Sequence, residues 1–211
     1  QRFGFGDLTG IDIHGEVRGL LPSTDWKRRA YKRADQQKWY AGETISLGIG
    51  QGYNNFTMLQ LAQATATLAN GGMKYKPKIV IATQDAVTRT KLAIPPVAPE
   101  NLGFSPENVA IVRNAMVGVT KEGTSVRSFA GASYLSGGKT GTAQAVGIGK
   151  NEKYDARRLD EHQRDHALYI AFAPADDPKI ALAIVVENAG FGSDSAAPIT
   201  RRIFDYWLLS Q

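Results

Sequence analysis

Residues 136–144, Ser-Gly-Gly-Lys-Thr-Gly-Thr-Ala-Gln, combine one ammonium group and two hydroxyls in a short segment flanked by glycines. Along an extended strand, side chains alternate between the two faces, so Lys139 would lie on one face and Thr140 and Thr142 on the other. A ligand that touches all three must therefore lie along the edge of the strand. An edge strand can pair its backbone with an extended peptide while charged and hydroxyl groups bind a carboxylate. The pattern favours an acyl-transfer site for a peptide.

The Lys-Thr-Gly triplet is weak evidence when it is taken alone. At average residue usage, a Lys-[Ser/Thr]-Gly triplet should occur in roughly one chain of this length in ten. Its neighbours make the pattern more specific, because a glycine pair precedes the triplet and Thr-Ala-Gln follows it. Two further blocks, at 48–72 and 164–190, provide the context that a short motif needs.

With these blocks, the chain resembles the C-terminal part of the transpeptidase domain of class B penicillin-binding proteins. The similarity covers essentially the whole chain and is most specific in three blocks: GIGQGYNNFTMLQLAQATATLANGG (48–72), GGKTGTAQ (137–144) and RDHALYIAFAPADDPKIALAIVVENAG (164–190). The last block, with Val186-Glu187-Asn188, is most similar to members of the elongation type, penicillin-binding protein 2. The resemblance implies an α/β fold of the penicillin-recognising serine transpeptidase/β-lactamase-like class, with an antiparallel sheet flanked by helices and an additional helical lobe.

The resemblance also implies a reaction and its participants. The complete domain would be a serine-type peptidoglycan D,D-transpeptidase, which is acylated by a D-Ala-D-Ala stem peptide, releases D-Ala and passes the acyl group to an amine. The expected partners are peptidoglycan stem peptides, β-lactam antibiotics and the membrane-bound elongation machinery, with no nucleic acid, cofactor or metal. The parent protein would lie in the bacterial inner membrane, facing the periplasm, and the fragment itself would be soluble.

The same resemblance assigns roles to the Lys-Thr-Gly-Thr residues. Lys139 and Thr142 would be catalytic: the Lys139 ammonium would favour carboxylate binding and proton transfer, and the Thr142 backbone N–H would form half of the oxyanion hole. Thr140, Gly141 and Thr142 would bind substrate. The two hydroxyls would contact its terminal carboxylate, and Gly141 would let its backbone approach the strand closely.

One part of the family's site is not found in the sequence. The nucleophilic serine of the family lies in Ser-x-x-Lys and its relay residues in Ser-x-Asn or Ser-x-Asp, all upstream of the matched region. Ser136 and Lys139 fit Ser-x-x-Lys formally, but the two glycines between them disfavour the helical turn that would bring them together. Ser193-Asp194-Ser195 is interpreted as a loop with a helix cap. We therefore expect an incomplete domain that is inactive alone.

Composition places the chain among ordinary globular proteins. It has 43% hydrophobic and 21% charged residues, a net charge of +5 and no cysteine, which excludes disulfides and thiol catalysis. His162 and His166 form the one i, i+4 histidine pair, and we expect solvated loop residues there rather than a zinc site. Six basic residues lie in 27–38. A solvated, mobile loop is the favoured interpretation, and a surface for an anionic polymer or lipid headgroups is the alternative.

Apolar spacing and turn residues predict the main elements. Helices are expected after three typical N-cap residues: Thr57, Ser105 and Ser195. Strands are expected at four apolar, β-rich segments: 74–83, 135–147, 167–174 and 179–188. Because the last two are almost continuously apolar, helices should cover both faces of their sheet. The C-terminal helix should cover one face with a stripe formed by Ile199, Ile203, Tyr206 and Trp207.

Three other segments complete the expected organisation. Residues 42–52 should form a short β-type run and a tight turn. The polar segment 147–166 should be a disordered insert or a lid beside the cleft. Within one transpeptidase domain, 1–134 would supply the helical lobe and connectors, and 135–211 the sheet strands and the C-terminal helix. Two further strands of the family's sheet would pair beside 179–188, and their absence would leave an apolar edge.

Two other functions remain open at this point. A D,D-carboxypeptidase or serine β-lactamase of the same superfamily would share the Lys-Thr-Gly strand, and turnover of a chromogenic cephalosporin would favour it. A non-catalytic, penicillin-binding-like interaction module would keep the fold without the chemistry. Lack of an upstream Ser-x-x-Lys would indicate that module.

Overall fold

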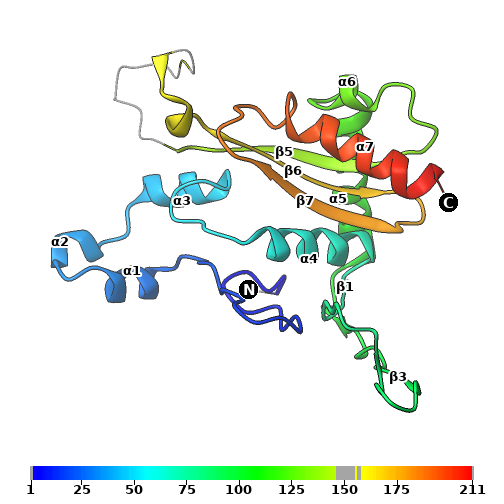
Figure 1. Cartoon of the computed structure of the whole chain (residues 1–211). Coiled ribbons are helices and arrows are strands. Elements are labelled where there is room, and N and C mark those ends of the chain that lie inside the picture. Colours follow the sequence, from blue (N-terminus) through cyan, green and yellow to red (C-terminus); the bar gives the residue numbers. More distant parts are fainter. Residues whose placement is uncertain (1, 146–154, 156–157, 211) are drawn as a thin grey trace. The chain divides into compact units, whose positions relative to one another are not determined.

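The computed structural model describes residues 2–145, 155 and 158–210, which form two compact units (Figure 1). The first unit comprises Gln1–Gln60 and Lys76–Pro96, and the second comprises Leu61–Tyr75 and Val97–Gln211. The Lys-Thr-Gly segment belongs to the second unit. None of the helices in the described part of the chain has the length and apolar character that a bilayer span requires.

The first unit contains three short helices and one β-hairpin: α1 (Thr24–Ala30), α2 (Ala34–Gln37), α3 (Ala41–Gly48), β2 (Ala82–Gln84) and β3 (Lys91–Ala93). The helix α3 replaces the β-type run expected at 42–52. Its first turn is fixed by Glu43, whose carboxylate accepts a hydrogen bond from the backbone N–H of Tyr40 at 2.8 Å. Gly50, with φ of 80°, follows the helix end. Capping thus overrides the weak β preference of this segment.

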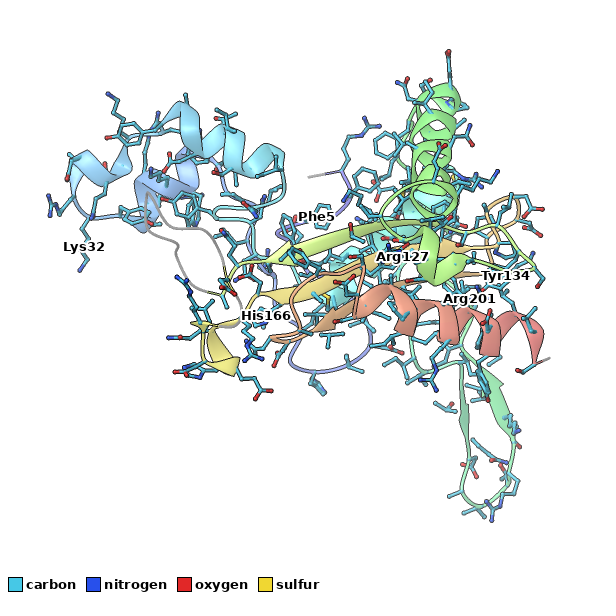
Figure 2. The ribbon with its side chains drawn as sticks, turned by 90° about the horizontal axis from the view of Figure 1, so that it is seen from above. Phe5, Lys32, Arg127, Tyr134, His166 and Arg201 are labelled. Carbon is cyan, nitrogen blue, oxygen red and sulfur yellow. The ribbon has the colours of Figure 1, made fainter. Side chains whose placement is uncertain are left out.

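The basic run 27–38 is largely exposed to solvent, as its charge indicated, but it is helical and not a loop, and one of its lysines is buried. Most of it forms α1 and α2, and the side chain of Lys27 is only 4% exposed. The Lys27 ammonium donates to Glu43 and, at 2.8 Å, to the carbonyl of Lys38, and it lies 5.3 to 5.9 Å from three aromatic ring centres. Lys32, by contrast, extends away from the helices (Figure 2). One lysine of the run therefore holds the helices together, because its charge is paired and surrounded by aromatic faces.

The second unit carries a three-stranded antiparallel sheet with helices on both sides. Its elements are α4 (Met58–Ala69), which begins in the first unit, β1 (Met73–Lys74), β4 (Glu100–Asn101), α5 (Pro106–Lys121), α6 (Val126–Phe129), β5 (Gly137–Ala143), a 3-10 turn (Glu161–Gln163), β6 (His166–Ala173), β7 (Ile180–Val186) and α7 (Ala196–Leu209). The strand order is β5-β6-β7. Three of the expected strands are therefore confirmed. The fourth, 74–83, is wrong, because it is divided between β1 and β2, which pair with different strands.

Apolar side chains cover both faces of this sheet, as the sequence predicted. On one face Tyr169 is buried beside Phe129 of α6 and Phe204 of α7. On the other face Phe172 is buried with Ala69 of α4 and Met116 of α5. Alternate residues of β6 point to opposite faces, so this one central strand contributes to both cores.

The helix α7 covers the sheet with a different face from the one expected. Its buried residues are Ala196, Ala197, Thr200 and Phe204, whereas the predicted stripe is turned outward, with Ile199 40%, Ile203 39%, Tyr206 74% and Trp207 47% exposed. Small side chains let the helix lie close to the strands, and Phe204 fills the remaining space. The orientation is also fixed by Tyr134, which donates to Asp205 at 2.8 Å, and by Arg201 above its ring (Figure 2).

The predicted N-caps behave differently from one another. The hydroxyl of Thr57 accepts a hydrogen bond from the backbone N–H of Gln60 at 3.1 Å, so this cap is confirmed. Ser105 and Ser195 occupy N-cap positions without a capping hydrogen bond from their side chains. The Ser195 hydroxyl instead donates to the carbonyl of Ala189 at 2.9 Å, which ties the start of α7 to the loop before it.

Candidate functional site

The strand β5 lies at an edge of the sheet. It pairs with β6 on one side, and among the described residues no strand pairs with its other side. Lys139 lies opposite Ile170 and Thr140 opposite Tyr169, so the two side chains belong to opposite faces, as the alternation predicted. Lys139 is exposed and Thr140 and Thr142 are partly buried. The strand thus offers an open backbone edge bordered by an ammonium group and two hydroxyls.

The ammonium group of Lys139 lies over its own strand. It donates to the carbonyl of Thr140 at 2.7 Å and lies 3.5 Å from the Thr140 hydroxyl oxygen. No carboxylate in the described ranges forms an ion pair with Lys139, whereas Lys179, on the connection into β7, is paired with Asp177. A lysine without a carboxylate partner at a strand edge can bind an incoming carboxylate without first breaking an ion pair.

The glycine pair before Lys139 has a structural cause that the sequence did not reveal. A Cβ atom at Gly137 would lie 2.5 Å from the Phe172 ring, and one at Gly138 would lie 2.3 Å from the Tyr169 hydroxyl oxygen. Both distances are far below van der Waals contact, so the two aromatic rings of β6 occupy the space that side chains would need. These glycines leave space for two core side chains of the protein itself and not for a ligand.

A third close approach involves a glycine that sequence reasoning did not select. A Cβ atom at Gly192, in the loop before α7, would lie 2.8 Å from the backbone oxygen of Gly141 and 2.1 Å from that of Leu168. The loop backbone therefore lies directly against the strand at Gly141, the last residue of Lys-Thr-Gly. The sequence signal was the pair Gly190-x-Gly192, which is common to many loops and identifies no contact.

Partly buried hydrogen bonds hold Ala145, just beyond β5, and His166 at the start of β6. The carboxylate of Asp165, a residue only 6% exposed, accepts from the backbone N–H of Ala145 at 3.3 Å. His166 begins β6, and its Nδ1 accepts from the backbone N–H of Asn188 at 2.9 Å. His166 is thus a strand residue with a structural hydrogen bond and not a solvated loop residue. Half of the expected insert or lid at 147–166 lies outside the described residues, which omit 146–154 and 156–157.

The two serine motifs that imitate the family's catalytic patterns have structural roles. Ser136 is 2% exposed and precedes β5 in non-helical backbone, so it does not form a helical Ser-x-x-Lys turn with Lys139. Its carbonyl accepts from the Thr120 hydroxyl of α5 at 2.7 Å. Ser193 donates to the neighbouring Asp194 carboxylate at 3.0 Å within the loop before α7. Neither serine is placed as an activated nucleophile.

A threonine outside the motif touches the site strand. The hydroxyl of Thr124, between α5 and α6, lies 3.1 Å from the hydroxyl of Thr140. The next residue, Ser125, is buried. Tyr169, whose side chain lies on the same face of the sheet as Thr140, is also buried, and this burial raises the pKa of its hydroxyl to about 12. An exposed threonine in Gly-Thr-Ser carries no local signal of a site, so sequence reasoning could not select it.

Comparison with known proteins places this geometry in context. Residues 1–205 match the family described as the penicillin binding protein transpeptidase domain. The chain is 42% identical over 211 residues to the peptidoglycan D,D-transpeptidase MrdA of Acinetobacter baumannii, with 100% of this chain and 30% of that protein covered. It is 40% identical to MrdA of Haemophilus influenzae, with 98% and 31% covered. The chain thus spans about a third of the length of these relatives.

Solved structures of similar proteins have the same fold. The crystal structure of Pseudomonas aeruginosa PBP2 in complex with WCK 5153 has a TM-score of 0.76 and 40% identity, covering 99% of this chain and 41% of that one. A complex between PBP2 and MreC from Helicobacter pylori has a TM-score of 0.76 and 26% identity, covering 99% and 34%. The α/β fold class expected from the sequence is therefore confirmed.

Proposed function

The chain belongs to the penicillin-binding protein transpeptidase family, as its three sequence blocks predicted, and we propose that it supplies the substrate-binding edge of a peptidoglycan D,D-transpeptidase of the PBP2 (MrdA) type. The observation that supports the proposal most is the open edge of β5. It presents Lys139, without a carboxylate partner among the described residues, beside the hydroxyls of Thr140 and Thr142.

The proposed roles of the site residues follow from this edge. An extended stem peptide lies along β5, with its terminal carboxylate bound by the Thr140 and Thr142 hydroxyls and attracted by the Lys139 ammonium. The nucleophilic serine, supplied by sequence outside these 211 residues, attacks the penultimate D-Ala carbonyl and expels D-Ala. The Thr142 N–H stabilises the oxyanion, and Gly141 keeps the strand accessible. Lys139 favours the proton transfers by stabilising negative charge nearby.

The proposed domain arrangement accounts for two open apolar surfaces. Residues 1–134 act as helical lobe and connectors, and 135–211 as sheet and C-terminal helix, of one larger transpeptidase domain. Among the described residues, no strand pairs with the outer side of β7, and Val185 on it is 38% exposed. The outward stripe of α7 includes Ile203 and Tyr206, which line a surface pocket of about 340 Å³. We place the remaining sheet strands beside β7 and further domain residues on this stripe.

Partners and location follow from the same assignment. β-Lactams act as substrate mimics, because they present a reactive carbonyl and a carboxylate in the arrangement of D-Ala-D-Ala. The H. pylori relative in complex with MreC supports an interaction of the parent protein with the elongation machinery. The parent protein then works at the periplasmic face of the bacterial inner membrane.

Acylation by a penicillin tests the proposal. The full-length protein is incubated with benzylpenicillin and weighed by mass spectrometry, and a stoichiometric mass increase is expected. Lys139→Ala should abolish the increase and leave the melting temperature unchanged, because an exposed edge lysine contributes little to stability. Lys179→Ala, which removes a lysine on the connection into β7, is the matched control and should acylate normally. Unmodified wild-type protein, or normal acylation of Lys139→Ala, would contradict the proposal.

A further inference from the structure

Two threonine hydroxyls connect the α5 region to β5, one full helical turn apart in sequence. The buried hydroxyl of Thr120 donates to the carbonyl of Ser136 at 2.7 Å, just before the strand begins. The exposed hydroxyl of Thr124 lies 3.1 Å from the hydroxyl of Thr140, inside the Lys-Thr-Gly motif. The first contact joins a side chain to the backbone before the strand and does not touch the Lys-Thr-Gly side chains. The second joins two rotatable hydroxyls and can set only the direction of a proton.

The backbone around Thr124 is held firmly. The N–H of Gly123 donates to the carbonyl of Gly118 at 3.0 Å, and a Cβ atom at Gly123 would lie 2.8 Å from the Cα of Val119. On the other side, the N–H of Ser125 donates to the Val119 carbonyl at 3.1 Å. Phe129, 7% exposed, anchors the short helix that follows. Thr124 is therefore presented to Thr140 from a fixed position and not from a free loop.

Hydrogen-bond valence determines what this contact does when a carboxylate binds. A hydroxyl has one proton and two acceptor positions, an ammonium group can only donate, and a carboxylate can only accept. To bind a carboxylate, Thr140 must therefore direct its single proton outward. Its two acceptor positions are then available to Lys139, whose Nζ lies 3.5 Å away, and to Thr124 at 3.1 Å. If Thr124 is the donor in this contact, both acceptor positions of the Thr140 hydroxyl are occupied.

We propose that Thr124 is a positioning residue for carboxylate recognition: it donates its proton to the Thr140 oxygen and thereby directs the Thr140 proton toward the carboxylate of the substrate or β-lactam. This inference rests on the proposed function, since it requires Thr140 to bind that carboxylate. Donation into Thr140 also polarises its O–H bond, which strengthens the outward hydrogen bond. A chain of three groups, Thr124, Thr140 and the carboxylate, forms the recognition unit.

Substitution of Thr124 in the full-length protein tests the inference. Thr124→Val removes the donor and keeps nearly the same shape, so the second-order rate constant for acylation by benzylpenicillin should fall roughly fivefold, the worth of one neutral hydrogen bond. Thr124→Ser retains the hydroxyl and should stay within twofold of wild type. Melting temperatures of both variants should match wild type. Benzylpenicillin methyl ester, which has no carboxylate, should acylate Thr124→Val and wild type at the same rate.

Two controls separate positioning from structure. Thr120→Val removes the buried hydroxyl one turn earlier, so it should lower the melting temperature and leave the acylation rate of the folded protein within twofold. In a double-mutant cycle, Thr124→Val should have no further effect once Thr140 is replaced by Val, because its only route to the ligand is gone. Additive effects of the two substitutions, or equal rates for Thr124→Val and wild type, would overturn the inference.

The outcomes also separate this inference from the proposed function. If the wild-type protein is not acylated, or if Lys139→Ala is acylated normally, the proposed function fails. If the wild type is acylated, Lys139→Ala is not, and Thr124→Val is unaffected, the function stands and the role of Thr124 is wrong.

Discussion

Replacement of Gly138 by alanine should destabilise the protein strongly, although one added methyl group at a strand position is usually harmless. The added Cβ would lie 2.3 Å from the Tyr169 hydroxyl oxygen and 2.6 Å from its Cζ atom. Tyr169 is fully buried and packs against Phe129, with ring centres 6.2 Å apart. Because the clash involves the ring itself, no rotation of a flexible end can relieve it.

The expected cost follows from the size of this overlap. Carbon atoms in contact normally lie about 3.5 to 4.0 Å apart, so the ring or the strand must move by roughly 1 Å within a packed core. Overpacking of this kind costs about 1 to 3 kcal/mol, and we expect the upper end of that range. For a protein of about 200 residues, this corresponds to a fall in melting temperature of roughly 6 to 12 °C.

Thermal unfolding followed by circular dichroism measures the effect, with Gly42→Ala as the matched control. Gly42 lies in α3, and no atom outside its immediate surroundings lies within 4 Å of its added Cβ, so this substitution should stabilise the protein by up to about 1 kcal/mol. Gly137→Ala, which meets Phe172 at 2.5 Å, should resemble Gly138→Ala. If Gly138→Ala melts within about 1 °C of wild type, less than the shift expected for 1 kcal/mol, the ring does not occupy this space and the reasoning is refuted.

Two further predictions concern the ion pair of the first unit and the orientation of α7. The hydrogen bond from Lys27 is the main reason why the pKa of Glu43 is lowered from its usual value of 4.5. The ionised Glu43 side chain should therefore stabilise the fold fully above pH 4.5, and this stabilisation should disappear as the pH falls through the lowered pKa of the folded protein. Glu43→Gln should therefore lower the melting temperature at pH 7 and weaken its acid dependence; the same acid dependence as wild type would contradict this. On α7, Phe204→Ser should cost roughly 3 to 5 kcal/mol and Ile203→Ser less than about 1 kcal/mol in urea unfolding of the 211-residue chain. Equal losses of unfolding free energy in the two variants would show that Ile203 is buried and would contradict this orientation of α7.

The sheet could be predicted from sequence because its signals are local and strong. The segments that form β6 and β7 are rich in β-branched and apolar residues, and a turn signal separates them. The edge strand β5 was identified through its glycines and motif. The sequence did not reveal why the glycine pair before it is needed, since the rings of Tyr169 and Phe172 that occupy this space lie in a strand about thirty residues later. No local pattern records such a contact.

The errors have the same origin in contacts between distant residues. The stripe expected to cover the sheet from α7 consists of large apolar residues, but the helix instead buries Ala196, Thr200 and Phe204, an equally regular set with smaller members. Periodicity alone does not choose between two stripes when the required distance to the sheet is unknown. Likewise, the Glu43 carboxylate that caps α3 also accepts from Lys27, sixteen residues earlier, and a charge count cannot reveal that pairing.

The close approach of Gly192 to Gly141 has a consequence for how this site can vary. The Gly192 backbone lies against β5 and β6 with no room for a side chain, because a Cβ atom at Gly192 would overlap the backbone oxygens of Gly141 and Leu168. Position 192 should therefore accept only glycine, although it lies about fifty residues from the Lys-Thr-Gly segment that imposes this limit. A library that randomises the loop before α7 while preserving the Lys-Thr-Gly segment would still displace that segment, and loss of acylation in it would report altered backbone spacing rather than lost chemistry.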